Sequence, residues 1–150
     1  SIVRFSVDTQ SLPVWIPEIE SNQNDRDLTI YSVTLSYLPE GSTSPFVQQT
    51  HVRWRPQNAN AILPPPPNET GSGFQSNSGF YYHAFSFQWV VFIILEALQS
   101  CFADLLAQLY LADISVLDVA LAPLLTWDPN TNIASIVAMP DYYSNKVNNY

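Results

Sequence analysis

The stretch SFQWVVFIILEALQSCFADLLAQL, residues 86–109, decides the fold of this chain. Its apolar side chains recur every three or four residues, and this spacing places them on one face of an α-helix. Ser86 stands directly before the run, where its hydroxyl can cap the first turn. The sequence therefore predicts one long amphipathic helix, whose buried stripe comprises Val91, Ile94, Leu95, Leu98, Cys101, Phe102, Leu105 and Leu109.

The start of this expected helix is apolar on almost every side. Trp89, Phe92 and Ile93 fall outside the main stripe, and residues 71–95 contain no acid and no Lys or Arg. Large apolar side chains gain free energy when they leave water. We therefore expect this end of the helix to pack on two sides, either within the chain or against a neighbouring subunit.

The chain before the helix carries the alternating pattern of β-strands. In residues 28–38 an apolar row alternates with a row of Ser and Thr, and residues 46–55 alternate in a similar way. A period of two is typical of a strand with one buried and one solvated face. Residues 3–7 form a third candidate strand, and prolines confine residues 12–17 to a sheet edge or a surface strap.

Two apolar runs after the helix predict a β-hairpin. Residues 119–127 and 133–139 are separated by DPNTN, residues 128–132, in which Pro fixes φ and Asn tolerates a positive φ. The expected fold class is therefore α+β. It consists of antiparallel strands, an N-terminal meander and a C-terminal hairpin, packed with one long amphipathic helix.

The length of 150 residues favours a single domain. Residues 1–55 form its β-rich part, residues 56–83 a loop rich in Pro, Gly and Ser, and residues 84–150 the helix and the hairpin. Asn68 lies in this loop and begins the sequon Asn-Glu-Thr, which makes it a possible glycosylation site if the chain enters the secretory route. The first residue is Ser1, so we expect a processed product, a trimmed chain or a piece of a longer one.

The charge of the chain argues against two classes of partner. Only 12% of the residues are charged, the net charge is −8, and residues 56–145 contain no Lys or Arg. Binding to nucleic acid needs a basic surface, so no nucleic-acid contact is expected. The longest apolar run, residues 89–95, is far shorter than the roughly 20 residues that span a bilayer, so membrane association is not expected either.

The sequence carries no catalytic signature. His51 and His83 are the only histidines, and neither has a second ligand or a carboxylate at a useful spacing. Cys101 is the only cysteine and cannot form an intramolecular disulfide. We therefore expect no enzymatic activity, no cofactor and no metal, and we interpret these acids as solvated residues or caps: Asp104, Asp113, Asp118 and Asp128.

Aromatic residues are more numerous near the helix start than one helix on one small sheet would need. Large aromatic side chains with few charges around them are typical of the centre of protein interfaces. The alternative is a single well-filled core within the chain. On the first interpretation the candidate interface residues are Trp15, Tyr81, Tyr82, Phe85, Trp89 and Phe92.

The chain resembles the structural proteins of virus particles. The similarity lies in the strap LPVWIP (residues 12–17), in residues 28–37, in FYY (residues 80–82) leading into the helix, and in LTWDPNTN (residues 125–132). The resemblance implies a capsid or minor capsid component, located in the virion, whose partners are other protein subunits in a homo- or hetero-oligomeric assembly. The alternative is a non-enzymatic binding module, extracellular or on the cell surface, that recognises carbohydrate or peptide through aromatic side chains.

Overall fold

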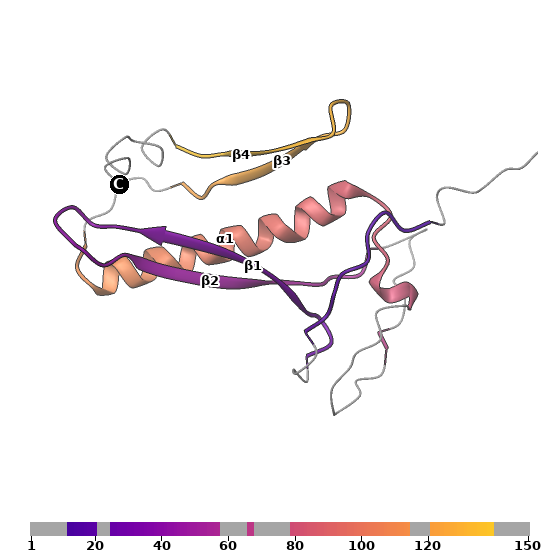
Figure 1. The fold of residues 1–150 in the computed structure, drawn as a ribbon, viewed down its shortest axis with the longest axis horizontal. Helices are drawn as coiled ribbons and strands as arrows, with labels where there is room; N and C mark the ends of the chain where they lie inside the picture. The colour runs from indigo at the N-terminus through magenta and orange to yellow at the C-terminus, as the bar shows by residue number, and fades with distance from the viewer. Residues whose placement is uncertain (1–11, 21–24, 58–65, 68–78, 115–120, 140–150) are drawn as a thin grey trace, which may run out of the picture.

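One long helix lies between two β-hairpins in the computed structural model, which describes residues 12–20, 25–57, 66–67, 79–114 and 121–139 (Figure 1). Both hairpins are antiparallel, so the predicted α+β class is confirmed. The elements in chain order are β1 (Leu28–Tyr37), β2 (Phe46–Arg53), the short 3-10 helix η2 (Phe80–Tyr82), α1 (Phe87–Leu111), β3 (Leu124–Asp128) and β4 (Ile133–Val137).

The first hairpin has one buried and one solvated face, as the alternation predicts. Val52 is 2% exposed on the inner face, whereas Ser32, Thr34 and Ser36 on the outer face are exposed. The pairing is irregular between Leu28 and Ser32. At this irregularity the buried Thr29 hydroxyl donates a hydrogen bond of 2.6 Å to the Val52 carbonyl, so this hydroxyl is paired although the ladder is interrupted.

Residues 12–20 run as a strap along the start of the first hairpin, which confirms the edge position predicted from the prolines. The strap makes two isolated bridges, Trp15 with Ala84 and Ile19 with Thr29. The Ala84 amide donates to the Trp15 carbonyl at 2.9 Å, so the strap joins the start of β1 to the chain just before α1. The candidate strand at residues 3–7 lies outside the described residues.

The helix packs on both sides within the chain. β1 and β2 cover one side, and β3 covers another. Of the predicted stripe, the buried residues are Leu98, Cys101, Leu105 and Leu109, whereas the remaining four are half-buried. Ile93 and Ala97 are also buried although neither was predicted in the stripe, because a helix covered on two sides buries more than one row.

The turn of the second hairpin forms as its sequence predicts. The Asp128 carboxylate accepts hydrogen bonds from the Asn130 amide at 2.9 Å and from the Thr131 hydroxyl at 2.8 Å. Both bonds stabilise the ionised form, so the pKa of Asp128 is lowered. Asn132 has φ 55°, a left-handed conformation that Asn tolerates better than most residues.

Candidate functional site

Two of the six candidate interface residues belong to the core. Tyr82 is fully buried and Tyr81 is 8% exposed, so the expectation that these two side chains are exposed is wrong. Both rings pack beside Trp54, whose indole Nε1 donates to the Tyr81 carbonyl at 2.8 Å. Here the alternative of a well-filled core applies, because the start of the helix, the strap and β2 converge on these rings.

The two tyrosine hydroxyls tie this core to the chain just before β1. Tyr81 donates to the Asp27 carboxylate at 2.9 Å, and Tyr82 donates to the Arg26 carbonyl at 2.8 Å. Burial, together with the nearby Asp27 charge, raises the pKa of Tyr82 to about 12. The hydroxyls therefore remain protonated donors over the physiological range, and they hold residues 25–27 in place.

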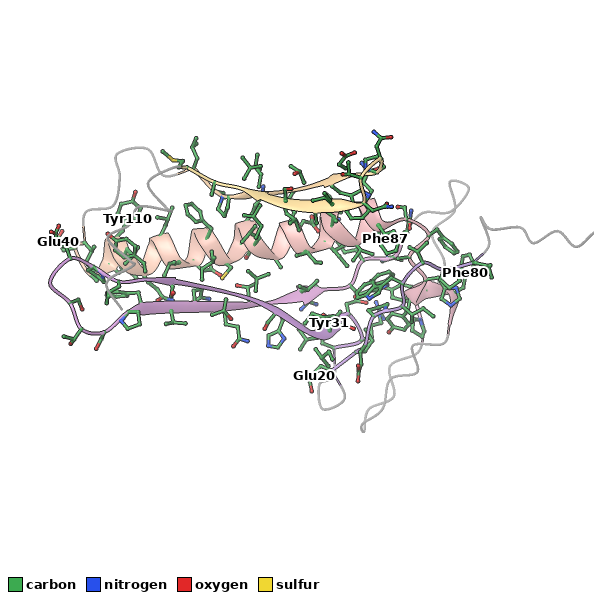
Figure 2. All side chains as sticks on the ribbon, turned by 45° about the horizontal axis from the view of Figure 1, so that its top comes forward. Glu20, Tyr31, Glu40, Phe80, Phe87 and Tyr110 are labelled. Carbon is green, nitrogen blue, oxygen red and sulfur yellow. The ribbon has the colours of Figure 1, made fainter. Side chains whose placement is uncertain are left out.

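The other four candidates lie at the surface end of the same core. Trp15 stacks 5.4 Å from Tyr31, and the Trp89 indole donates to the Arg55 carbonyl at 2.9 Å. Phe92, 39% exposed, lies 5.2 Å from the Trp89 ring, and the Phe85 ring contacts Phe80 at 5.2 Å. Figure 2 shows Phe80 and Phe87 at this end of the molecule, where their side chains are about half exposed.

A larger exposed apolar surface lies on the second hairpin, and the sequence reasoning did not include it. Leu124 is 46% exposed, Ile133 57%, Ile136 60% and Val137 55%. We call these four residues the hairpin surface; Leu124, Ile133 and Val137 share one face of the hairpin, and Ile136 lies on the other face, opposite Leu125. The signal that could have found it is the nearly continuous apolar run 133–139, which does not alternate as β1 does.

Exposed apolar side chains also occur on the strap and at the C-terminal end of α1. Leu12, Val14 and Ile16 form the outward row of the strap, each at least 40% exposed. At the far end of α1, Tyr110 and Leu111 are 63% and 89% exposed.

The residues considered for chemistry do not converge. The His51 Nδ1 lies 3.3 Å from the Thr29 carbonyl, and the His83 ring is held between Phe80 and Phe85. The Cys101 thiol is buried and donates to the Gln48 carbonyl of β2 at 3.2 Å. Across the described part of the chain, no group of three His, Cys, Asp or Glu side chains could hold a metal. Asn68 lies outside the described residues.

The described arginines each lie beside a carboxylate. Arg53 pairs with Asp25 at 2.7 Å, Arg55 pairs with Glu96 of α1, and Arg26 lies 3.9 Å from Asp27. Partial burial opposes ionisation of Asp25, but the Arg53 guanidinium outweighs it and lowers the pKa of this carboxyl. Trp54, between Arg53 and Arg55 in the sequence, is buried. These cations are partly neutralised: Arg26 precedes β1, Arg53 ends β2 and Arg55 follows it.

By length and composition α1 would be able to cross a membrane. A core helix of a globular domain meets the same criteria, and here α1 is covered by β1, β2 and β3. Glu96 in its middle pairs with Arg55 of the chain after β2. These contacts cover only part of α1, since 28% of its most apolar stretch is buried.

Comparisons with known proteins agree on one group. The family model of the Sputnik minor capsid protein V18/19 matches residues 1–150. Protein V18 of the Sputnik virophage is 31% identical over 108 residues, which are 71% of this chain and 62% of V18. A chain in the 3.5 Å cryo-EM structure of the Sputnik virophage is 28% identical, with a TM-score of 0.64 over 93% of this chain and 35% of that chain. The present chain thus spans less than two thirds of the length of either relative.

Proposed function

The chain belongs to the Sputnik minor capsid protein V18/19 family, and we propose that it helps to build a virus particle through contacts with other protein subunits. The family makes it a structural protein of the virion, so the predicted class and the predicted location are confirmed. The match over all 150 residues is the observation that carries this function.

The exposed apolar side chains support a function through contacts with other protein subunits. A protein that works alone in water leaves apolar side chains scattered, whereas subunits gather them where a neighbour will cover them. The strap row, Phe92 and the hairpin surface expose large apolar side chains on three elements. We propose that these regions make the subunit contacts, with Trp15, Phe85 and Trp89 supporting them from beneath.

We propose that the contacts of this chain are with protein and not with the genome. The described arginines lie beside carboxylates, and the net charge of the whole chain is −8. A surface of this kind supplies little of the counterion release that drives binding to phosphates. A structural, non-enzymatic role is consistent with the separation of His51, His83 and Cys101.

The alternative of a carbohydrate- or peptide-binding module is not favoured. The family match supports a virion protein instead, and the large rings of Trp54 and Tyr82 are buried and cannot stack on a sugar. The solvated face of the first hairpin carries Ser and Thr on β1.

Sedimentation of the virus that encodes this chain tests the proposal. We expect mass spectrometry of density-gradient fractions to find the chain in the particle peak, together with the other shell proteins. A non-structural protein of the same virus, measured in the same gradient, is the control and should stay at the top. Recovery of the chain only with that control would contradict the proposed function.

A further inference from the structure

The two outer layers of the molecule differ in polarity. The first hairpin lies on one side of α1 and the second hairpin on the other, as Figure 1 shows. On the second hairpin the face directed away from α1 carries Leu124, Ile133 and Val137, each at least 46% exposed. The corresponding face of the first hairpin is polar. The two faces are therefore suited to different surroundings in an assembly.

Three pairs of residues on neighbouring strands form the outward face of the first hairpin. All six side chains are exposed, and five of them are polar. The Gln49 amide donates to the Ser32 hydroxyl at 2.7 Å, which joins the two strands across this face. We call these residues the polar face, and its pairs are Ser32 with His51, Thr34 with Gln49, and Ser36 with Val47.

The alternate residues of the same strands face the helix. Val33 packs against the core cluster, and the Gln48 side chain accepts a hydrogen bond from Gln108 of α1. The Cys101 thiol of α1 donates to the Gln48 carbonyl at 3.2 Å. Because successive side chains of a strand point to opposite sides of the sheet, the polar face is directed away from α1.

A neighbouring subunit would gain little by covering the polar face. Hydroxyl and amide groups that leave water cost free energy unless each finds a new hydrogen-bond partner. The face offers one apolar side chain, Val47, in return. Permanent subunit interfaces are more apolar than this. Water is therefore a more favourable neighbour for the polar face than a second protein surface.

The first hairpin also lacks the charge that suits a surface turned towards a packaged genome. Residues 28–53 contain no Lys and one Arg, and this Arg53 pairs with Asp25 at 2.7 Å. Glu40 in the turn adds a carboxylate. Binding to phosphates requires Lys and Arg that release counterions. Of the two sides of a shell, the outside thus fits the polar face better.

We propose that the polar face is displayed on the outer surface of the virus particle, and that the second hairpin lies on the side of the subunit contacts. This inference rests on the proposed function, and it adds the orientation of the chain in the shell. The opposite polarity of the two outer layers is the observation that supports it.

Cysteine labelling of intact particles tests this orientation. The native Cys101 is buried and gives little background. Thr34→Cys places a thiol in the polar face, and Thr126→Cys makes the same change on the outward face of the second hairpin; both threonines are exposed. The probe is a maleimide attached to a polymer too large to enter the shell.

We expect the two variants to react at similar rates in the isolated chain. In intact particles Thr34→Cys should keep this rate within about twofold, whereas Thr126→Cys should react at least about tenfold more slowly, because subunit contacts exclude the reagent. Diethyl pyrocarbonate provides a measurement on particles without substitutions. His51 lies in the polar face and should be modified as fast in the particle as in the isolated chain.

Three results would overturn the inference. Protection of Thr34→Cys and His51 in intact particles would show that a neighbour covers the polar face. Labelling of Thr34→Cys only after the particles have been opened would place this face inside the shell. Fast labelling of Thr126→Cys in intact particles would show that the second hairpin is not on the contact side. Absence of the chain from particles, detected by immunoblotting before labelling, would instead refute the proposed function itself.

Discussion

Trp54 is the residue on which the described core depends most. Its indole is 2% exposed, packs 6.0 Å from Trp15 and 6.2 Å from Tyr82, and donates to the Tyr81 carbonyl. It thus joins β2, the strap and the chain before α1 in one cluster. Alternation along an extended chain points its side chain away from those of Arg53 and Arg55, which is consistent with its burial.

Trp54→Ala should destabilise the fold by about 3–5 kcal/mol, because it leaves a cavity and an unpaired carbonyl. Urea unfolding followed by circular dichroism measures this change. The control is Val47→Ala on β2, the strand that precedes Trp54; it removes an exposed side chain and should change stability by less than about 0.5 kcal/mol. Similar losses in the two variants would show that the core lies elsewhere.

The buried Tyr82 hydroxyl makes the stability of the fold depend on alkaline pH. Its pKa is about 12 in the folded chain and near 10 in an unfolded one. Because the folded state raises this pKa, its contribution to stability is complete below about pH 10 and is lost as the pH rises towards 12. We expect Tyr82→Phe to flatten the decrease in unfolding free energy between these limits, measured against Tyr110→Phe, whose side chain is 63% exposed. Identical pH profiles of the two variants would contradict this assignment.

The three largest elements follow from local sequence patterns. The 3.6-residue period predicts α1, with Ser86 accepting a hydrogen bond from the Trp89 amide at 3.3 Å, and the two-residue period predicts β1 and β2. The pattern also indicates that the helix start packs on two sides. It could not specify which residues would face the second hairpin, since that depends on the crossing of elements far apart in sequence.

Asn132 determines the geometry of the turn between β3 and β4. Its φ of 55° is strained for a β-branched residue and free of strain for Gly. Asn132→Val should therefore destabilise the hairpin by about 1–2 kcal/mol, whereas Asn132→Gly should be nearly neutral. Amide exchange in β3, measured for both variants, reports this difference. Faster exchange in the Gly variant than in the Val variant would contradict the role of the turn.

For the whole molecule, the resemblance to virus structural proteins predicted the class of protein better than composition predicted the site. Few charges, many aromatics and the overall resemblance led to a virion protein, which the family match confirms. The interface residues were harder to predict, because the sequence does not distinguish a Tyr in the core from a Tyr at an interface. Tyr81 and Tyr82 are buried, and only their partners Asp27 and Arg26, more than 50 residues away, explain why.

The subunit contacts should resist salt and yield to denaturant, because the exposed surfaces that we assign to them are apolar. At about 1 M salt the screening length falls to about 3 Å, which removes most attraction between surface charges. We expect particles washed in NaCl at about this concentration to retain the chain, and particles washed in urea to release it. Immunoblotting of pellet and supernatant measures both. Release by salt alone would show that ion pairs hold the chain in the particle.

The N-terminal hairpin is synthesised well before the helix that covers it. The Cys101 thiol contacts the carbonyls of Val33 and Gln48, which precede it by 68 and 53 residues. The apolar rows of β1 and β2 therefore leave the ribosome uncovered and stay so until α1 has been translated. Contacts that are so distant along the chain also slow folding. A nascent chain that stalls within this interval exposes a half-built core, and this is the period in which the host's chaperones would be needed.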